Sequence, residues 1–300
     1  MISGSALRLS PPATLLVEPL VRAALLEDLG RAGDITTEAI TGPHTKAEGN
    51  IVARHPGRIA GLGVAGLAFA LVDSETSFEP QIADGNDVRA GQVLANVRGS
   101  ARALLIAERT ALNFLGHLSG IASATQELVR AVEQTRARIA DTRKTTPGLR
   151  ILEKYAVRAG GGMNHRFGLD DAVLIKDNHI VAGGSITAAV ERVRQGIGHM
   201  VKIEVEVESL AELDEALFCG VDAVLLDNMT PGQLREAVLR VNGRCVTEAS
   251  GSITAQTVLA VAQSGVDVIS VGWITHSAPT LDVALDFLTR PGSEASPDPG

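Results

Sequence analysis

The feature that most constrains the fold of this chain is a regular alternation of strand-like and helix-like segments after about residue 120. Six short β-branched runs cover residues 138–142, 172–175, 202–207, 223–226, 245–249 and 267–271. Amphipathic stretches such as residues 210–218 and 231–241 separate them, which predicts βα units around a parallel sheet. Six units are fewer than the eight of a closed barrel, and no Gly-rich dinucleotide fingerprint accompanies them. We therefore expect an open, incomplete α/β barrel.

The part before residue 120 is more mixed and predicts a separate domain. A helical pattern at residues 18–27 is followed by strand-like runs at 47–54 and 58–62, tight turns at 84–94 and a long helical pattern at 101–118. We expect a flexible leader over residues 1–12, an N-terminal domain over 13–120, the barrel domain over 121–290 and a disordered tail over 291–300.

Composition excludes several classes of function. The net charge of −8 argues against a general nucleic-acid binder. The longest apolar run, residues 59–72, is interrupted by glycines and is shorter than the ~20 residues that cross a bilayer. The two cysteines have no metal-type spacing, and so few cysteines are typical of a reducing compartment. We expect a cytoplasmic protein without a membrane or nucleic-acid partner.

Polar and Gly-rich residues follow the predicted barrel strands at their carboxyl ends. Because these ends meet at one mouth of a barrel, where active sites lie, the repetition predicts a functional site there. The residues at these strand ends include Thr142, Arg143, Lys144, Lys176, Asp227, Ser250, Gly251, Ser252, Gly272 and His276, with Glu206 inside the third strand.

The charges at this mouth suit a small anion with several carboxylate or phosphate groups. Arginine offers a planar fork that matches a carboxylate, and lysine offers a point charge that suits phosphate. The acidic residues Glu206 and Asp227 could hold Mg²⁺ or ribose hydroxyls, or stabilise positive charge at a reacting carbon. The basic set is Arg143, Lys144, His165, Arg166 and Lys176.

Each of these patterns also has a structural explanation. Arg143 and Lys144 could form a solvated loop. Glu206 alternates with Glu204 and Glu208, so all three carboxylates would be solvated if that face of the strand were exposed. The run of three glycines at residues 160–162 indicates close backbone approach, either to a ligand or to a neighbouring element.

Several longer segments resemble signature segments of the quinolinate phosphoribosyltransferases. They are residues 108–113, 119–122, 141–150, 153–157, 160–168 and 174–179, and the resemblance runs from about Leu25 to Phe287. It implies an N-terminal α/β sandwich domain followed by an open α/β barrel. It also implies a pentosyltransferase of NAD biosynthesis that converts quinolinate and phosphoribosyl pyrophosphate to nicotinate mononucleotide, pyrophosphate and CO2. The implied cofactor is Mg²⁺, and the implied assembly is a homodimer, possibly a higher oligomer, with an active site shared between subunits.

The resemblance also implies roles for individual residues. For quinolinate they are Arg109, Thr142, Arg143, His165, Arg166 and Lys176. For phosphoribosyl pyrophosphate they are Lys144, Glu206, Asp227, Ser250, Gly251, Ser252, Gly272 and His276. Lys144, Lys176, Glu206 and Asp227 are the implied catalytic residues, and Glu206 and Asp227 are the implied metal ligands. From the residues alone, Arg109 would be a helix-surface residue. The family usually has glycine where this chain has Ser252, and a positive φ there would strain a serine.

Three other functions compete with this hypothesis. One is a related pyrophosphorylase-like protein encoded with molybdate transporters, whose motifs lack the full segments found here. Another is an aldolase that forms a Schiff base on Lys176. The third is a non-catalytic sensor of pyridine carboxylates, which would not need both Glu206 and Asp227.

Overall fold

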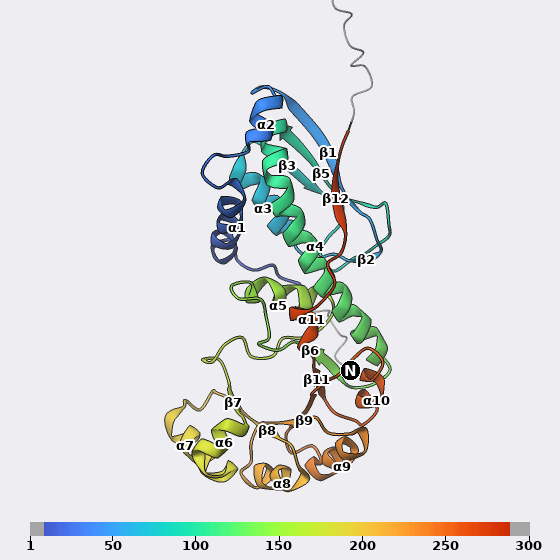
Figure 1. The fold of residues 1–300 in the computed structure, drawn as a ribbon. Coiled ribbons are helices and arrows are strands. Elements are labelled where there is room, and N and C mark those ends of the chain that lie inside the picture. The colour runs from blue at the N-terminus through green and yellow to red at the C-terminus, as the bar shows by residue number, and fades with distance from the viewer. Residues whose placement is uncertain (1–8, 289–300) are drawn as a thin grey trace, which may run out of the picture. The chain divides into compact units, whose positions relative to one another are not determined.

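A computed structural model describes residues 9–288, and the chain divides into two compact units (Figure 1). Within the described residues, the first unit comprises residues 9–119 and 280–288, and the second comprises residues 120–279. Residues 1–8 of the predicted leader and the whole predicted tail, 291–300, lie outside the described residues.

The first unit is built on a four-stranded antiparallel sheet with the strand order β12-β1-β5-β3. Helix α3 packs on it, because Phe69 of the helix stacks on Phe78 of β3 with ring centroids 5.9 Å apart. Strands β2 and β4 form a separate pair. The elements are α1 (Thr14–Leu29), α2 (Ile35–Ile40), β1 (Lys46–Ala53), β2 (Gly57–Arg58), α3 (Leu62–Val72), β3 (Ser77–Pro80), β4 (Asp87–Val88), β5 (Val93–Ser100), the first part of α4 (Ala101–Val132), and β12 (Val283–Phe287).

The last strand corrects the predicted domain boundary. Residues up to 290 were assigned to the barrel, whereas β12 pairs antiparallel with β1, from Gly49 opposite Phe287 to Ala53 opposite Val283. Strand β1 uses one edge for β5 and needs a partner on the other, which β12 supplies. The predicted boundary near residue 120 falls inside α4, a single helix that continues to Val132.

The predicted strand at residues 58–62 is wrong beyond its first residue. Only Gly57 and Arg58 pair in β2, and Leu62 already begins α3. The backbone turns there because Gly61 adopts a φ of 103°, and Asp84 accepts hydrogen bonds from the amides of Gly61 and Leu62 at 2.9 and 3.1 Å. The apolar run is therefore mostly a helix of the first unit. Across residues 9–288, no helix combines the length and the apolar character needed to span a bilayer.

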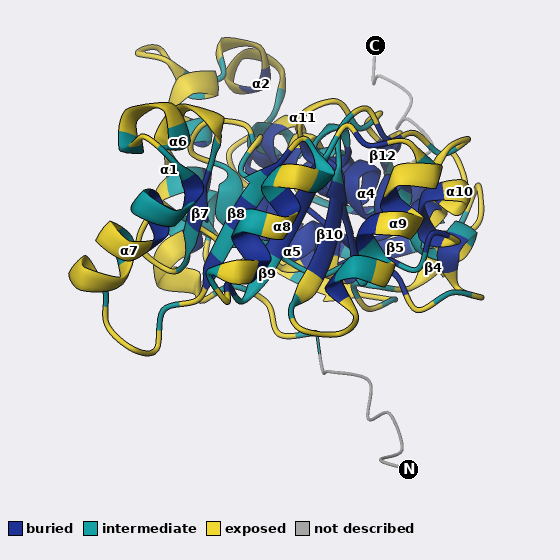
Figure 2. Ribbon diagram, turned by 90° about the horizontal axis from the view of Figure 1, so that it is seen from below, coloured by how far each residue is buried: buried dark blue, intermediate teal, exposed yellow. Residues whose placement is uncertain are grey.

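The second unit is a six-stranded parallel sheet with the order β6-β11-β10-β9-β8-β7. Strands β6 and β7 are its two edges, so the barrel is open, and the predicted fold class is confirmed. In Figure 2 the outer helices α7, α8 and α9 carry exposed residues, while β9 and β10 are largely buried. The elements are β6 (Arg138–Ala140), α5 (Arg150–Ala159), β7 (Val173–Ile175), α6 (Asp177–Gly183), α7 (Ile186–Gly196), β8 (Ile203–Val207), α8 (Leu210–Phe218), β9 (Ala223–Asp227), α9 (Pro231–Val241), β10 (Val246–Ser250), α10 (Val258–Ala262), β11 (Val268–Ser270) and α11 (Trp273–His276).

Two of the helices that follow the barrel strands, α8 and α9, begin at strong capping residues. The Ser209 hydroxyl accepts from the Glu212 amide, and the Glu212 carboxylate accepts from the Ser209 amide, each at 3.2 Å. Helix α9 begins after Thr230 with Pro231 in its first turn. Such caps satisfy amides that have no partner within the helix, which explains why these two helices begin where the sequence predicts.

The glycine run at residues 160–162 packs against a neighbouring helix. A Cβ on Gly160 would lie 2.6 Å from both the Ala122 carbonyl oxygen and the Thr125 Cβ of α4. A Cβ on Gly162 would lie 2.8 Å from Thr125 Cγ2. Of the two explanations that the sequence left open, the structure supports close approach to a neighbour.

We predict that Gly160→Ala lowers the free energy of unfolding by about 1–3 kcal/mol, because the methyl group meets backbone that cannot move aside. Gly196→Ala is the matched control: Gly196 ends α7, and a Cβ added there would have nothing within 4 Å. The control should be neutral or slightly stabilising. Urea denaturation of both variants tests this, and equal effects would contradict the packing explanation.

Candidate active site

Two adjoining pockets open at the carboxyl ends of the strands of the second unit. They share Thr142, Lys144, Asp227, Ser250 and Ser270. We call the first, of about 380 Å³, the glycine-rich pocket; its predicted residues beyond the shared set are Gly251, Ser252, Gly272 and His276. We call the second, of about 410 Å³, the basic pocket; its predicted residues beyond the shared set are Arg143, His165, Arg166, Lys176 and Glu206.

The structure thus brings together every predicted site residue except Arg109. That residue is exposed on α4 in the first unit and lines neither pocket. Its role in a neighbouring subunit stays a prediction.

Unpaired buried polar atoms gather around the basic pocket. Arg143 Nε, Arg166 Nε, Ser270 Oγ and Glu248 Oε1 are buried and make no hydrogen bond within the described residues. Only one other described side chain, that of Thr76, has such an atom. An unsatisfied buried polar group costs about 1–3 kcal/mol, so their clustering indicates a polar ligand. The two guanidinium groups can only donate, so the ligand must present acceptor oxygens.

A buried ion pair holds the loop that carries His165 and Arg166. Lys154 Nζ of α5 lies 2.5 Å from Asp141 Oδ1, and their side chains are 4% and 0% exposed. Asp141 also accepts from the His165 amide at 2.9 Å and from Asn164 Nδ2 at 2.6 Å, and Lys154 donates to the His165 carbonyl at 3.0 Å. Burial raises the pKa of Asp141, while the neighbouring Lys154 charge opposes that shift.

Sequence reasoning gave no role to Asp141, Lys154 or Asn164, although all three lie in the segments that carry the family resemblance. One signal was available for Lys154. The chain has only five lysines, and this one lies in α5 between residues with the spacing of a buried helix face, including Leu152 and Tyr155.

The His165 ring lies between two carboxylates. Its Nε2 is 2.9 Å from Glu204 Oε2 and 3.6 Å from Glu248 Oε1, and its Nδ1 accepts from the Arg166 amide at 2.7 Å. Burial by itself lowers the pKa of His165, but the hydrogen bond to Glu204 and the charges of Glu248 and Glu204 outweigh it and raise the pKa overall. Burial, followed by the charge of Glu204, raises the pKa of Glu248 to about 7.

The alternating carboxylates of β8 divide between the pocket and the surface. Glu204 and Glu206 face inward with side chains 12% and 13% exposed, whereas Glu208 is exposed beyond the strand end. Glu206 forms an ion pair with Lys176, whose side chain is 44% exposed. A Schiff-base lysine is normally activated by desolvation or by a neighbouring cation, so this exposed and paired Lys176 disfavours the aldolase hypothesis.

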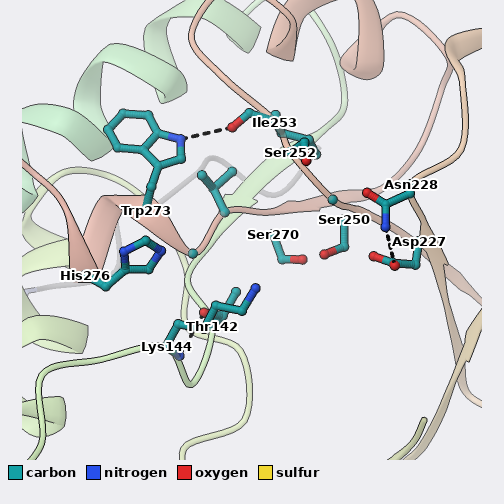
Figure 3. A pocket seen from close by; sticks show the side chains of 13 residues that line it. Thr142, Lys144, Asp227, Asn228, Ser250, Ser252, Ile253, Ser270, Trp273 and His276 are labelled. Carbon is teal, nitrogen blue, oxygen red and sulfur yellow. Dashed lines mark hydrogen bonds between the residues drawn. The ribbon is translucent and has the colours of Figure 1, made fainter. Parts of the chain in front are cut away.

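The loops at Gly251 and Gly272 form the glycine-rich pocket, and the first of them has an unusual backbone conformation (Figure 3). Gly251 has a φ of 101°, and a Cβ there would collide with Asn228 Oδ1. Ser252 has a φ of 49°, so the serine is strained at this position, by about 1–2 kcal/mol. A Cβ on Gly272 would lie 2.9 Å from Lys144 Cδ. Any side chain at Gly251 or Gly272 would therefore fill space that is open in this pocket.

The hydrogen bonds drawn in Figure 3 fix the rim of this pocket. Trp273 Nε1 donates to the Ile253 carbonyl at 3.0 Å, and Asn228 Nδ2 donates to Asp227 Oδ2 at 2.6 Å. The Thr275 hydroxyl donates to the Lys144 carbonyl at 2.7 Å, which joins α11 to the loop after β6. Sequence reasoning did not identify Trp273 or Ser270 as pocket residues.

Together the fold and the two pockets are typical of an enzyme of the open α/β-barrel class, with its site at the carboxyl ends of the strands. Comparison with known proteins identifies the family. Residues 34–119 match the quinolinate phosphoribosyl transferase N-terminal domain, and residues 121–286 match the C-terminal domain of the same family. The chain belongs to the quinolinate phosphoribosyltransferase family, which confirms the resemblance seen in the sequence.

Individual relatives cover nearly the whole chain. The probable nicotinate-nucleotide pyrophosphorylase (carboxylating) of Bacillus subtilis (strain 168) is 45% identical over 272 residues, which are 91% of this chain and 93% of that protein. The nicotinate-nucleotide pyrophosphorylase (carboxylating) of Mycobacterium leprae (strain TN) is 45% identical over 272 residues, 89% of this chain and 95% of that protein. The crystal structure of NadC from Streptococcus pyogenes has a TM-score of 0.89 and 42% identity, covering 93% of this chain and all of that one.

The buried ion pair generates a testable prediction. Asp141→Asn and Lys154→Met should each lower the free energy of unfolding by about 3–5 kcal/mol, because each leaves one buried charge without its partner. The double variant should lose less than the sum of the two single variants. A double-mutant cycle measured by urea denaturation gives the coupling free energy, and additive losses would show that the pair does not act as a unit.

Proposed function

We propose that the chain transfers the phosphoribosyl group of phosphoribosyl pyrophosphate to the ring nitrogen of quinolinate. The products are nicotinate mononucleotide, pyrophosphate and CO2, and the reaction belongs to NAD biosynthesis. The observation that carries the proposal is the set of unpaired buried donors in the basic pocket, next to a pocket with glycine-lined loops. The names of the curated relatives support the same reaction.

The basic pocket suits the two adjacent carboxylates of quinolinate. Arg143 and Arg166 each offer an unused Nε–H, and a planar guanidinium matches a carboxylate with two parallel hydrogen bonds. Thr142, His165 and Lys176 complete the proposed quinolinate set. Their work is to fix the ring so that its nitrogen faces the sugar.

The glycine-rich pocket suits the phosphate groups of the second substrate. Gly251 and Gly272 leave the backbone open to close approach, and Lys144 and His276 add side chains that favour anions. Ser250 and Ser252 add hydroxyl groups. Asp227 lines both pockets, and Glu206 lines the basic one, so both carboxylates lie where the ribose must connect the two substrates.

The chemistry follows from this placement. The pyridine nitrogen attacks C1 of the ribose as pyrophosphate leaves, and positive charge develops on the sugar. Glu206 and Asp227 stabilise that charge, while Lys144 and Lys176 neutralise the anionic groups of the substrates. The pyridinium nitrogen then eases loss of the neighbouring carboxylate, because the electron pair left on the ring carbon lies next to a positive charge.

Magnesium fits the acidic residues as a partner of the diphosphate. Mg²⁺ is commonly held by one or two carboxylates together with water and substrate phosphate, and Glu206 and Asp227 supply two carboxylates. When bound, the ion neutralises charge on the leaving diphosphate.

We further propose a cytoplasmic homodimer, possibly part of a higher oligomer, in which Arg109 of one subunit contributes to the quinolinate site of the other. Arg109 is exposed in the first unit and lines neither pocket of its own chain, which is consistent with that role. The net charge of −8 is consistent with no nucleic-acid partner, and we propose no membrane partner.

Substrate choice tests the function. With phosphoribosyl pyrophosphate and Mg²⁺ held constant, the enzyme should form nicotinate mononucleotide from quinolinate and not from nicotinate, which lacks one carboxylate. Leaving buried donors unpaired should reduce turnover of nicotinate by about 10⁴-fold or more. Comparable use of the two acids would refute the proposal of a pocket for two carboxylates.

Arg166→Ala should weaken quinolinate binding by about 2–5 kcal/mol, because it removes a partly buried charged contact. Isothermal titration calorimetry measures this directly. Arg138→Ala is the control, since Arg138 is exposed at the opposite end of β6 and should leave the affinity unchanged. An unchanged affinity in the Arg166 variant would remove it from the quinolinate site.

Mixed dimers test the shared site. Arg109→Ala and Lys176→Ala homodimers should both be nearly inactive. A dimer that combines one subunit of each kind should regain activity, because one of its two sites then carries both defects and the other carries neither. Absence of recovery in verified mixed dimers would place Arg109 outside the partner's site.

A further inference from the structure

The proposed reaction needs a proton that its substrates do not supply. When the carboxylate leaves the ring carbon next to the nitrogen, its bonding electron pair stays on that carbon, and a proton must replace the lost CO2. The arginines of the basic pocket cannot provide it, because guanidinium groups do not release protons in proteins. The donor must therefore be another acid of this pocket or a water molecule.

Glu248 has the position expected of such an acid. It lies on β10, between β9 and β11, is only 5% exposed, and lines the basic pocket. Its Oε1 accepts no hydrogen bond from the described residues and lies 3.6 Å from His165 Nε2. A buried carboxylate without hydrogen bonds is costly, whereas a neutral carboxylic acid at the same place is tolerated.

The groups around Glu248 favour its neutral form. Glu204 on β8 and Asp141 after β6 add negative charge, and His165 adds the opposing positive charge. The Ser270 hydroxyl of β11 lies close enough to lower the pKa of Glu248, although Ser270 Oγ and Glu248 Oε1 make no hydrogen bond of normal geometry. The positive charge of Lys154 on α5 lowers the pKa of His165. With a pKa of about 7, Glu248 keeps its proton in a large fraction of the molecules near neutral pH.

Two other proton donors that line the pocket, His165 and Lys176, are already engaged. The Arg166 amide donates to His165 Nδ1, so in the neutral ring the proton lies on Nε2, where it is donated to Glu204. Lys176 is paired with Glu206. The trio His165, Glu204 and Glu248 also has the composition of a metal site, but the positive charges of Lys154 beside His165 and of Arg166 beside Glu204 oppose binding of a cation.

We propose that Glu248 is the acid that protonates the pyridine carbon from which CO2 leaves, an inference that rests on the proposed function. The bond between this carbon and the carboxylate breaks, CO2 departs, and the electron pair remains on the carbon. That pair takes the proton of the Glu248 carboxyl group, which becomes a carboxylate. Glu248 regains a proton from solvent when the product leaves.

Single-turnover, rapid-quench experiments on the full chain separate the two steps of the reaction. The first is phosphoribosyl transfer, which releases pyrophosphate, and the second is decarboxylation. Glu248→Gln keeps the size of the side chain but has no proton to give. It should release pyrophosphate at nearly the wild-type rate and accumulate the nucleotide that still carries both carboxylates. Formation of nicotinate mononucleotide should fall about 100-fold or more. Glu208→Gln, on the exposed end of the same sheet, is the control and should behave as wild type.

A measurement on the wild-type enzyme makes the test independent of how the variant folds. The rate of the decarboxylation step should fall as pH rises through about 7, because Glu248 then loses its proton. A flat profile, normal decarboxylation by Glu248→Gln, or a defect confined to pyrophosphate release would each overturn the inference. If the wild-type enzyme formed no nucleotide at all, the proposed function itself would fail, which is a different outcome.

Discussion

The buried contact between Asp141 and Lys154 is the interaction on which the rest of the barrel mouth depends. It joins the end of β6 to α5, and both partners also bind the backbone of His165. Two buried charges are expensive to desolvate, so this pair is a poor source of stability compared with apolar packing. The pair instead fixes the backbone of His165 in the loop between α5 and β7, from which His165 and Arg166 line the basic pocket.

Around the basic pocket, several buried polar atoms have no hydrogen-bond partner within the described residues. Guanidinium nitrogens at Arg143 and Arg166, and oxygens at Ser270 and Glu248, are withdrawn from water without a protein partner. A ligand that supplies partners for these atoms removes the free-energy penalty of burying them unpaired, which favours ligands with several acceptor oxygens. The same low-dielectric surroundings strengthen each charge interaction with a bound substrate.

Much of this architecture could be predicted from the sequence because it depends on local patterns. The β-branched runs predicted all six barrel strands, and the amphipathic patterns at residues 210–218 and 231–241 predicted helices α8 and α9 with their bounds. The polar and Gly-rich residues that follow the predicted strands include most of the residues that line the two pockets. The pairing of β12 with β1 and the contact of Lys154 with Asp141 could not be predicted, because both join segments whose approach is decided by tertiary structure. Glu248 was visible in the sequence, but its burial and its nearness to Glu204 were not.

The pairing of β12 with β1 has a consequence for the order in which this chain can fold. A ribosome completes residues 120–279 before it reaches residues 283–287, so every strand of the second unit exists before the first unit has its full sheet. Until then, one edge of β1 has unpaired amides and carbonyls along its length, a surface on which other chains could add a strand. The part of the protein that is synthesised first is therefore completed last, and its exposed edge persists for the whole time that the barrel takes to emerge.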